Sequence, residues 1–254
     1  MHGLVLRQPF RLDGSRLDAC PPHTQAGSPR TLYRYAACLP SFLYAADRAL
    51  SSKAAVQSLR KIVQSLCDLD QKLTGWFGDF RREKDYALDK EGSLRYLEVG
   101  LIWQFKAMSP NELFGPLLRF VSFQNAHIHS LYWQCLLLLR STLQLLMAQI
   151  TWTAHHPRFS ALRGRDLRAE VQACANLLCR SIPFLLSSAG GNTSKAAAIR
   201  APLLFARECF ERSGQFNKLE WCEMVEAESR AHFATLDWES VLPWSLLAII
   251  WQPS

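Results

Sequence analysis

The stretch SLYWQCLLLLRSTLQLLMAQITW, residues 130–152, decides the fold. Between Arg119 and Arg158 the only formal charge is Arg140, which stands in the middle of this stretch. A segment of about 20 largely apolar residues can cross a membrane, but it can equally form the buried centre of a helical core. Which of the two it forms determines the fold class and limits the functions that the chain can have.

Polar residues within the stretch favour a buried helix over a membrane span. A mid-span arginine alone costs roughly 2.5–3.5 kcal/mol on insertion scales. Small or polar residues also recur at alternating steps of three and four, which places most of them in one narrow stripe along a helix. The positions of this stripe are His127, Ser130, Gln134, Leu137, Ser141, Gln144 and Ala148. A helix that is apolar over the rest of its circumference belongs in the centre of a bundle. Membrane association remains the alternative.

Arg140 needs a partner if this helix is buried, because an unpaired buried guanidinium is too costly. We therefore expect Arg140 to reach an acidic side chain or a carbonyl oxygen at the edge of the core.

Helical periodicity continues on both sides of the central stretch. Apolar residues recur at steps of three and four over 52–76 and again over 163–186, which predicts an amphipathic helix in each range. Residues 187–194 are expected to form a loop. Pro202 is expected in the first turn of a helix that continues to Ser213, with Gly214 as its C-terminal stop, and Asn217 with Glu220 resembles the capping box of a following helix. Asp237 is expected to cap a last helix.

No series of strands and no repeat of fixed period accompanies these patterns. The sequence therefore predicts an all-α fold, an irregular multi-helix bundle around a central hydrophobic helix at about 122–154. Residues 1–35, which contain several prolines and glycines, are expected to form an irregular lead-in. Residues 36–254 are expected to form a single helical domain.

Composition is that of a globular protein: 49% of the 254 residues are hydrophobic, 20% are charged and the net charge is +7. The eight cysteines are scattered without a C-x-x-C pair, which indicates reduced thiols in an intracellular protein. The first residues show no apolar segment of the kind found in signal peptides.

The sequence carries no motif that predicts a catalytic, cofactor-binding or metal site, and no cofactor is expected. Phosphate-binding loops, dinucleotide fingerprints, a nucleophile elbow and the zinc-protease motif are all missing. His127 and His129 lie about 200° apart on a helix and do not face one metal. Cys174 and Cys179 are five residues apart, which favours packing over zinc ligation. Asp68 and Asp70 likewise lie on different faces.

Charged clusters indicate solvated surface. Glu208 with Glu211 and Glu223 with Glu226 share helix faces with nearby arginines, which predicts exposed ion pairs. A basic cluster precedes the 163–186 helix, and it lacks the interleaved aromatic residues of a nucleic-acid surface. It comprises Arg158, Arg163, Arg165 and Arg168. A solvated helix start is the favoured interpretation, with a phosphate-contacting patch as the alternative.

Three segments together resemble the C-terminal helical domain of fungal Zn2Cys6-type transcription factors. In FVSFQNAHIHSLYWQCLLLLRSTLQ (120–144) an aromatic-rich lead-in precedes an alanine and a Tyr-Trp pair. ANLLCRSIPFLLS (175–187) is similar to the family's Cys-Arg-Ser-Ile-Pro helix end. IRAPLLFARECFERSGQFNKLEWCEMV (199–225) resembles its Pro-Leu-x-x-Ala helix and the Glu-Trp helix that follows. The matching residues are Phe120, Phe123, Ala126, Tyr132, Trp133, Pro202, Leu203, Ala206, Glu220, Trp221 and Cys222.

The chain departs from this family where the family's DNA-binding unit stands. The family's C-x2-C-x6-C zinc cluster cannot be formed, because Cys20 and Cys38 are the only cysteines in the first 60 residues. The resemblance implies a regulatory helical domain, nuclear or nucleocytoplasmic, that acts through protein partners and lacks its own DNA-reading unit. The alternative is a helical-bundle enzyme whose site is assembled from distant residues, such as His127, Arg140 and an acidic residue.

Overall fold

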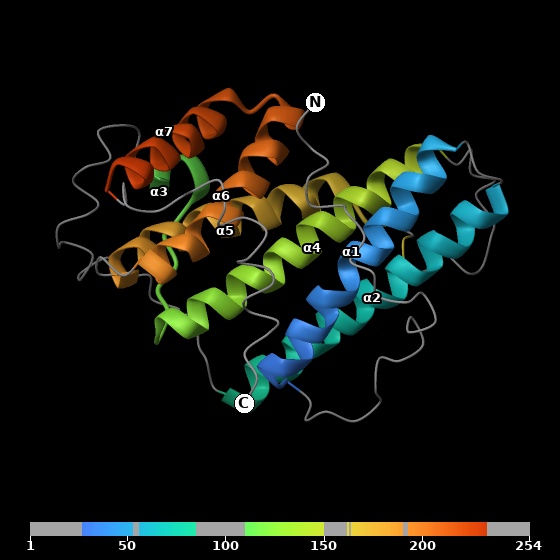
Figure 1. Cartoon of the computed structure of the whole chain (residues 1–254), viewed down its shortest axis with the longest axis horizontal. Helices are drawn as coiled ribbons and strands as arrows, with labels where there is room; N and C mark the ends of the chain where they lie inside the picture. The colour runs from blue at the N-terminus through green and yellow to red at the C-terminus, as the bar shows by residue number, and fades with distance from the viewer. Residues whose placement is uncertain are drawn as a thin grey trace. The chain divides into compact units, whose positions relative to one another are not determined.

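The structure, a computed structural model, describes residues 27–52, 56–84, 110–149, 162, 164–189 and 193–232. Seven α-helices and no strand make up these ranges (Figure 1). The predicted all-α, multi-helix fold is therefore confirmed. None of the seven described helices combines the length and the apolar character that a membrane span requires.

The chain divides into two compact units, and each unit is made of two separate segments of the sequence. Unit 1 contains residues 1–84 and 135–171, and unit 2 contains residues 85–134 and 172–254. Two helices, α4 (Phe123–Gln149) and α5 (Leu167–Ala189), therefore supply residues to both units. The single domain expected over 36–254 stays a prediction.

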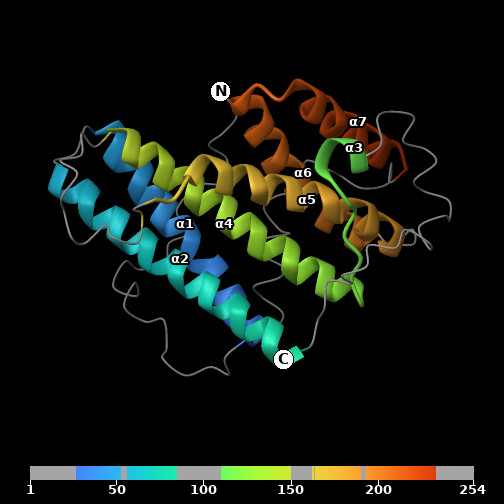
Figure 2. The same cartoon turned by 180° about the vertical axis from the view of Figure 1, so that it is seen from behind.

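Unit 1 is built on an antiparallel pair of helices, α1 (Pro29–Ser51) and α2 (Val56–Lys84). The two helices lie side by side in both views (Figures 1 and 2). Trp76 donates a hydrogen bond from Nε1 to the carbonyl oxygen of Ser28, 2.8 Å away, which ties the start of α1 to the last turns of α2. Gly27 has a φ of 76°, and a Cβ there would come within 2.8 Å of the Phe80 backbone nitrogen, so this close approach requires glycine.

Helix α1 begins earlier than the expected start of the helical domain, and α2 ends later than the helix expected over 52–76. Helix α1 begins at Pro29, within the segment expected to be irregular, because proline at the first helical position has the φ that a helix needs. Helix α2 continues past Gly75 and Gly78 to Lys84. Glycine in a helix interior costs about 1 kcal/mol relative to alanine, and the burial of Trp76 and Phe80 offsets that cost.

Helix α4 corresponds to the central helix expected at about 122–154; residues 150–154 lie outside the described ranges. All seven residues from Leu131 to Leu137 are buried, as expected of a helix at the centre of a bundle. The polar stripe is mostly buried in the first half of α4 and exposed toward its end. Ser130 and Gln134 are buried and hydrogen-bond to each other at 3.1 Å, whereas Gln144 and Ala148 are exposed.

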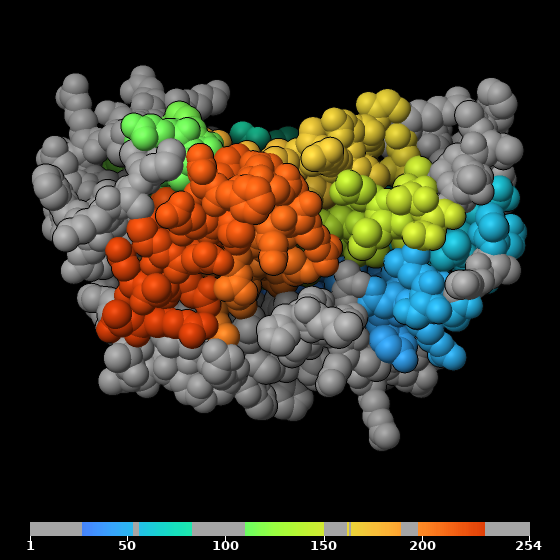
Figure 3. Space-filling view, turned by 90° about the horizontal axis from the view of Figure 1, so that it is seen from above, coloured from blue at the N-terminus to red at the C-terminus, as the bar shows by residue number. Residues whose placement is uncertain are grey.

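Unit 2 contains α3 (Pro110–Phe114), α6 (Thr193–Ser213) and α7 (Phe216–His232). The Phe114 ring packs edge-on against Trp221 with centroids 4.9 Å apart and lies 5.8 Å from Phe210. Helices α6 and α7 pack closely and form one continuous area, orange to red, in the space-filling view (Figure 3).

The turn between α6 and α7 ends α6 at Ser213, with Gly214 directly after it, as expected. Gly214 has a φ of 69°, and the Gln215 amide donates to the Phe210 carbonyl at 3.0 Å, which is a Schellman helix end. Two expectations nearby were wrong. Pro202 lies inside α6, because the helix begins nine residues earlier at Thr193. Asn217 is not a cap, because α7 already begins at Phe216.

The expected loop at 187–194 is shorter than predicted. Helix α5 continues to Ala189 and α6 begins at Thr193, so helical residues occupy both ends of that range. The helix expected after Asp237 lies outside the described residues, as does most of the lead-in at 1–35.

Candidate functional site

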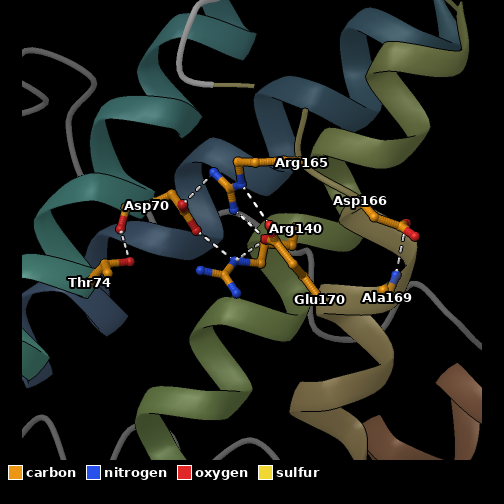
Figure 4. Close-up of polar contacts among 7 residues, drawn as sticks. All are labelled: Asp70, Thr74, Arg140, Arg165, Asp166, Ala169 and Glu170. Atoms are coloured by element: carbon orange, nitrogen blue, oxygen red, sulfur yellow. Dashed lines mark hydrogen bonds and ion pairs between the residues drawn. The ribbon is translucent and has the colours of Figure 1, made fainter. Parts of the chain in front are cut away.

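Four charged side chains meet in unit 1, and we call them the ion cluster: Asp70, Arg140, Arg165 and Glu170 (Figure 4). Asp70 comes from α2 and Arg140 from α4, whereas Arg165 lies just before α5 and Glu170 in its first turn. Three segments that are far apart in sequence therefore converge on one polar site.

The turn before α5 presents Arg165 to the cluster. Gly164, at a φ of 73°, reverses the chain, and the Arg165 amide donates to the Leu162 carbonyl at 3.3 Å. Asp166 then caps the helix, because its Oδ1 accepts a hydrogen bond from the Ala169 amide at 3.0 Å. Glu170 is thus held one turn into α5, where the helix dipole favours an anion.

Asp70 is the acceptor that joins the three segments. Its Oδ1 accepts a hydrogen bond from Arg140 Nε at 2.8 Å, and its Oδ2 accepts one from Arg165 Nη1 at 2.8 Å. Both carboxylate oxygens are therefore used by guanidinium groups from other segments. Asp70 is held on its own helix, where Thr74 Oγ1 donates to the Asp70 backbone carbonyl at 2.8 Å.

Glu170 closes the cluster into a ring of alternating charge. Arg165 forms a bidentate contact with Glu170: Nε donates to Oε1 at 2.8 Å and Nη2 donates to Oε2. Arg140 Nε also lies 3.3 Å from Glu170 Oε2. Two cations and two anions give a neutral ring, and such forked guanidinium–carboxylate contacts are the strongest type of charge-assisted hydrogen bond.

Asp70 is the most deeply buried member of the ion cluster. The side chain of Asp70 is 5% exposed and that of Arg140 14%, whereas Arg165 and Glu170 are 23% and 27% exposed. The hydrogen bonds from Arg165 lower the pKa of Glu170, and burial opposes this shift. The same bonds to Glu170 raise the pKa of Arg165. The pairing therefore favours the charged form of each of these two residues.

The prediction that Arg140 reaches an acidic partner is confirmed by the contacts to Asp70 and Glu170. Sequence reasoning missed the other members. Arg165 was grouped with Arg158, Arg163 and Arg168 as a solvated helix start, but only Arg168 fits that description among the described residues. Arg158 and Arg163 lie outside them. From the sequence, Asp70 was placed only on a different face from Asp68. Its position four residues after Leu66 and three before Leu73, within the apolar stripe of the expected helix, was the signal that could have identified it.

The ion cluster does not extend to His127. His127 and Arg140 are thirteen residues apart on α4, which corresponds to about 20 Å of helix rise. The His127 ring stacks parallel to Phe123, with centroids 6.3 Å apart, and burial lowers its pKa to about 4. Within the described ranges, His127 therefore does not join Arg140 and an acidic residue, which is the combination named as an example for the enzyme alternative.

Thiols near and within the central helix are held in the protonated form. Burial raises the pKa of Cys135 to about 12 and that of Cys67 to about 11; the Asp70 carboxylate adds to the rise at Cys67. No group of three or more histidine, cysteine, aspartate or glutamate side chains in the described part of the chain could hold a metal ion. The ion cluster thus ties helices together, and its carboxylates are already engaged by arginines.

Residues that carry the transcription-factor resemblance are mostly core residues. Tyr132 and Trp133 are 5% and 3% exposed, and Ala206 and Trp221 are 0% and 1% exposed. They specify how helices pack and contribute no chemistry to the ion cluster. Comparisons with models of known protein families, with curated proteins and with solved structures found no match to the chain.

Proposed function

We propose that the chain is a partner-binding helical domain of the kind found in transcription regulators. It acts through protein partners, is nuclear or nucleocytoplasmic, does not read DNA itself and performs no catalysis. The proposal rests on the resemblance of residues 120–144, 175–187 and 199–225 to the helical domain of fungal zinc-cluster regulators, together with the surface of unit 2.

The observation that carries the proposal is an exposed aromatic side chain. Phe216, the first residue of α7, is 73% exposed, and Val121, also in unit 2, is exposed to the same extent. Aromatic residues, phenylalanine included, are enriched in protein interfaces relative to the rest of the surface. We therefore expect a protein partner to contact Phe216.

The charges of the ion cluster support the same proposal. Asp70 and Glu170 form ion pairs with Arg140 and Arg165 in a neutral ring. Such paired carboxylates are suited to holding helices together and less suited to transferring protons. A carboxylate that serves as a general base needs a pKa close to the operating pH, whereas the pKa of Glu170 is lowered.

A reporter assay tests the proposal. The full chain is fused to an unrelated zinc-cluster DNA-binding domain, and transcription from a reporter with that domain's site is measured in fungal cells. We expect the fusion to change expression relative to the DNA-binding domain alone. Phe216→Ser should weaken partner binding by about 2 kcal/mol or more, roughly 30-fold in affinity, and abolish the change.

The matched control is Val56→Ser. Val56 is also the first residue of its helix and is 49% exposed, but it belongs to unit 1. This variant should behave as the unchanged fusion. A reporter that responds identically to the fusion and to the DNA-binding domain alone contradicts the proposed function, provided that immunoblotting shows equal amounts of both proteins in the nucleus.

A further inference from the structure

Two buried thiols in unit 2 face each other across a helix interface. Cys179 of α5 and Cys222 of α7 place their Sγ atoms 3.8 Å apart. We propose that this pair is an oxidation site, at which a two-electron oxidant of the peroxide class forms a disulfide that joins α5 to α7. The inference concerns the fold of unit 2 and is independent of the proposed function.

The geometry requires only a small movement. A disulfide bond is about 2.05 Å long, so the two sulfur atoms must approach by about 1.8 Å. Both residues are almost completely buried, at 0% and 1% exposure, and no other group has to leave the space between two atoms that are already in contact. Helix α7 follows the short turn at Gly214, where the chain can absorb a small shift of the helix.

A lysine supplies positive charge beside the pair. Lys218 lies one turn before Cys222 on α7, and its Nζ donates to Asn176 Oδ1 at 3.0 Å. The ammonium group also lies over the rings of Phe114 and Phe210, at 5.6 and 5.4 Å from their centroids. Burial raises the pKa of Cys179, and the charge of Lys218 opposes that rise. Lys218 therefore stabilises the thiolate that the reaction needs.

The chemistry balances with hydrogen peroxide as the oxidant. One thiolate attacks a peroxide oxygen, which breaks the O–O bond and gives a sulfenic acid, and the departing hydroxide takes up the thiol proton as water. The second sulfur then displaces the sulfenic hydroxyl group, which leaves with the second thiol proton as another water. The sulfur pair loses two electrons and the peroxide gains them.

This disulfide forms slowly at neutral pH, because only the thiolate attacks and burial keeps Cys179 protonated. The rate of formation should therefore increase as the pH is raised. Once formed, the bond closes a loop between residues 43 positions apart and restricts the unfolded chain.

Mapping of disulfides in the full chain tests the inference. The protein is treated with hydrogen peroxide, remaining thiols are alkylated with iodoacetamide in denaturant, and the digest is examined by mass spectrometry without reduction. We expect a peptide pair linked through Cys179 and Cys222 as the main product, removed by dithiothreitol. The oxidised protein should show a rise in Tm of about 5–10 °C that dithiothreitol reverses.

Variants separate this pair from buried thiols in general. Cys222→Ala should abolish the linked peptide and the rise in Tm, whereas Cys135→Ala, which removes another buried thiol, should retain both. The mapping of the unchanged chain decides the question even where Cys222→Ala does not fold. The inference is overturned if Cys179 and Cys222 are recovered alkylated, as sulfinic acids, or linked mainly to other cysteines such as Cys209.

Discussion

The Nε atom of Arg140 lies 2.8 Å from Oδ1 of Asp70, although the two residues are 70 positions apart in the chain. Asp70 has the less exposed side chain of the two, and it also accepts a hydrogen bond from Arg165. The one formal charge of the central apolar stretch is thus paired with a buried carboxylate of α2.

Replacing Asp70 with asparagine should destabilise the protein strongly. The change leaves Glu170 as the one carboxylate in the ion cluster for two guanidinium groups, and a buried charge that loses its partner typically costs about 3–5 kcal/mol. We expect a loss of about 3 kcal/mol in the free energy of unfolding, because Glu170 still compensates part of the charge. Urea denaturation followed by circular dichroism measures it.

The control for this variant is Asp68→Asn, two residues earlier on α2. Asp68 is exposed, and its Oδ1 accepts a hydrogen bond from Gln64 Nε2, 2.9 Å away on the same helix. Its replacement should change the free energy of unfolding by less than about 0.5 kcal/mol. Equal effects of the two variants would show that the ion cluster does not contribute to stability.

Asp70→Asn combined with Arg140→Gln should cost less than the sum of the two single changes. Each single variant leaves the ring with a net charge, whereas the double variant restores neutrality and keeps the Arg165–Glu170 fork. We expect a coupling energy of about 1–3 kcal/mol from the double-mutant cycle in urea. A strictly additive pair would mean that Arg140 and Asp70 do not interact energetically.

The sequence predicted the helices well because their signal is local. The spacing of apolar residues in the central stretch and the glycine at 214 are properties of neighbouring residues, and both predictions hold in the structure. Pro202 misled the prediction of α6, because proline is favoured in the first turn of a helix and disfavoured in its interior, whereas α6 contains Pro202 in its interior.

The ion cluster could be predicted only in part because it is not local. A buried, unpaired charge is costly, so the apolar sequence around Arg140 was enough to predict that this residue has a partner. The identity of the partner depends on how α2 packs near α4 and on the turn at Gly164, which presents Arg165 to Asp70. The contact between Cys179 and Cys222 likewise depends on tertiary packing, and spacing along the chain gives no sign of it.

Acid should weaken the protein through Glu170. Hydrogen bonds from Arg165 lower the folded-state pKa of Glu170 below the unfolded value of about 4.3. The resulting stabilisation is complete above about pH 4.3 and is lost as the pH falls through the folded-state pKa. Urea midpoints measured between pH 6 and pH 2.5 should decline more steeply for the unchanged chain than for Glu170→Gln. At pH 6 the midpoint of this variant should already be lower than that of the unchanged chain. Glu223→Gln, at an exposed position on α7, should keep the steep decline.

His127 should remain neutral well below the pH at which an ordinary histidine takes up a proton. Burial lowers its folded-state pKa to about 4, whereas the unfolded value is about 6.5. In an NMR titration, the ring-proton signal that disappears in His127→Phe should therefore stay constant from pH 7.5 to about pH 5 and shift only below that. A midpoint near 6.5 would contradict the burial of this ring.

The same difference in pKa makes stability depend on pH in a defined window. Between about pH 6.5 and pH 4 the unfolded state binds a proton at His127 that the folded state does not, so stability is complete above pH 6.5 and decreases as the pH falls toward 4. His127→Phe removes this proton uptake and retains an aromatic ring beside Phe123. Its urea midpoint should therefore fall less between pH 7 and pH 4.5 than that of the unchanged chain. Because Glu170 acts mainly below this window, the two contributions can be separated by measuring both variants over the full range.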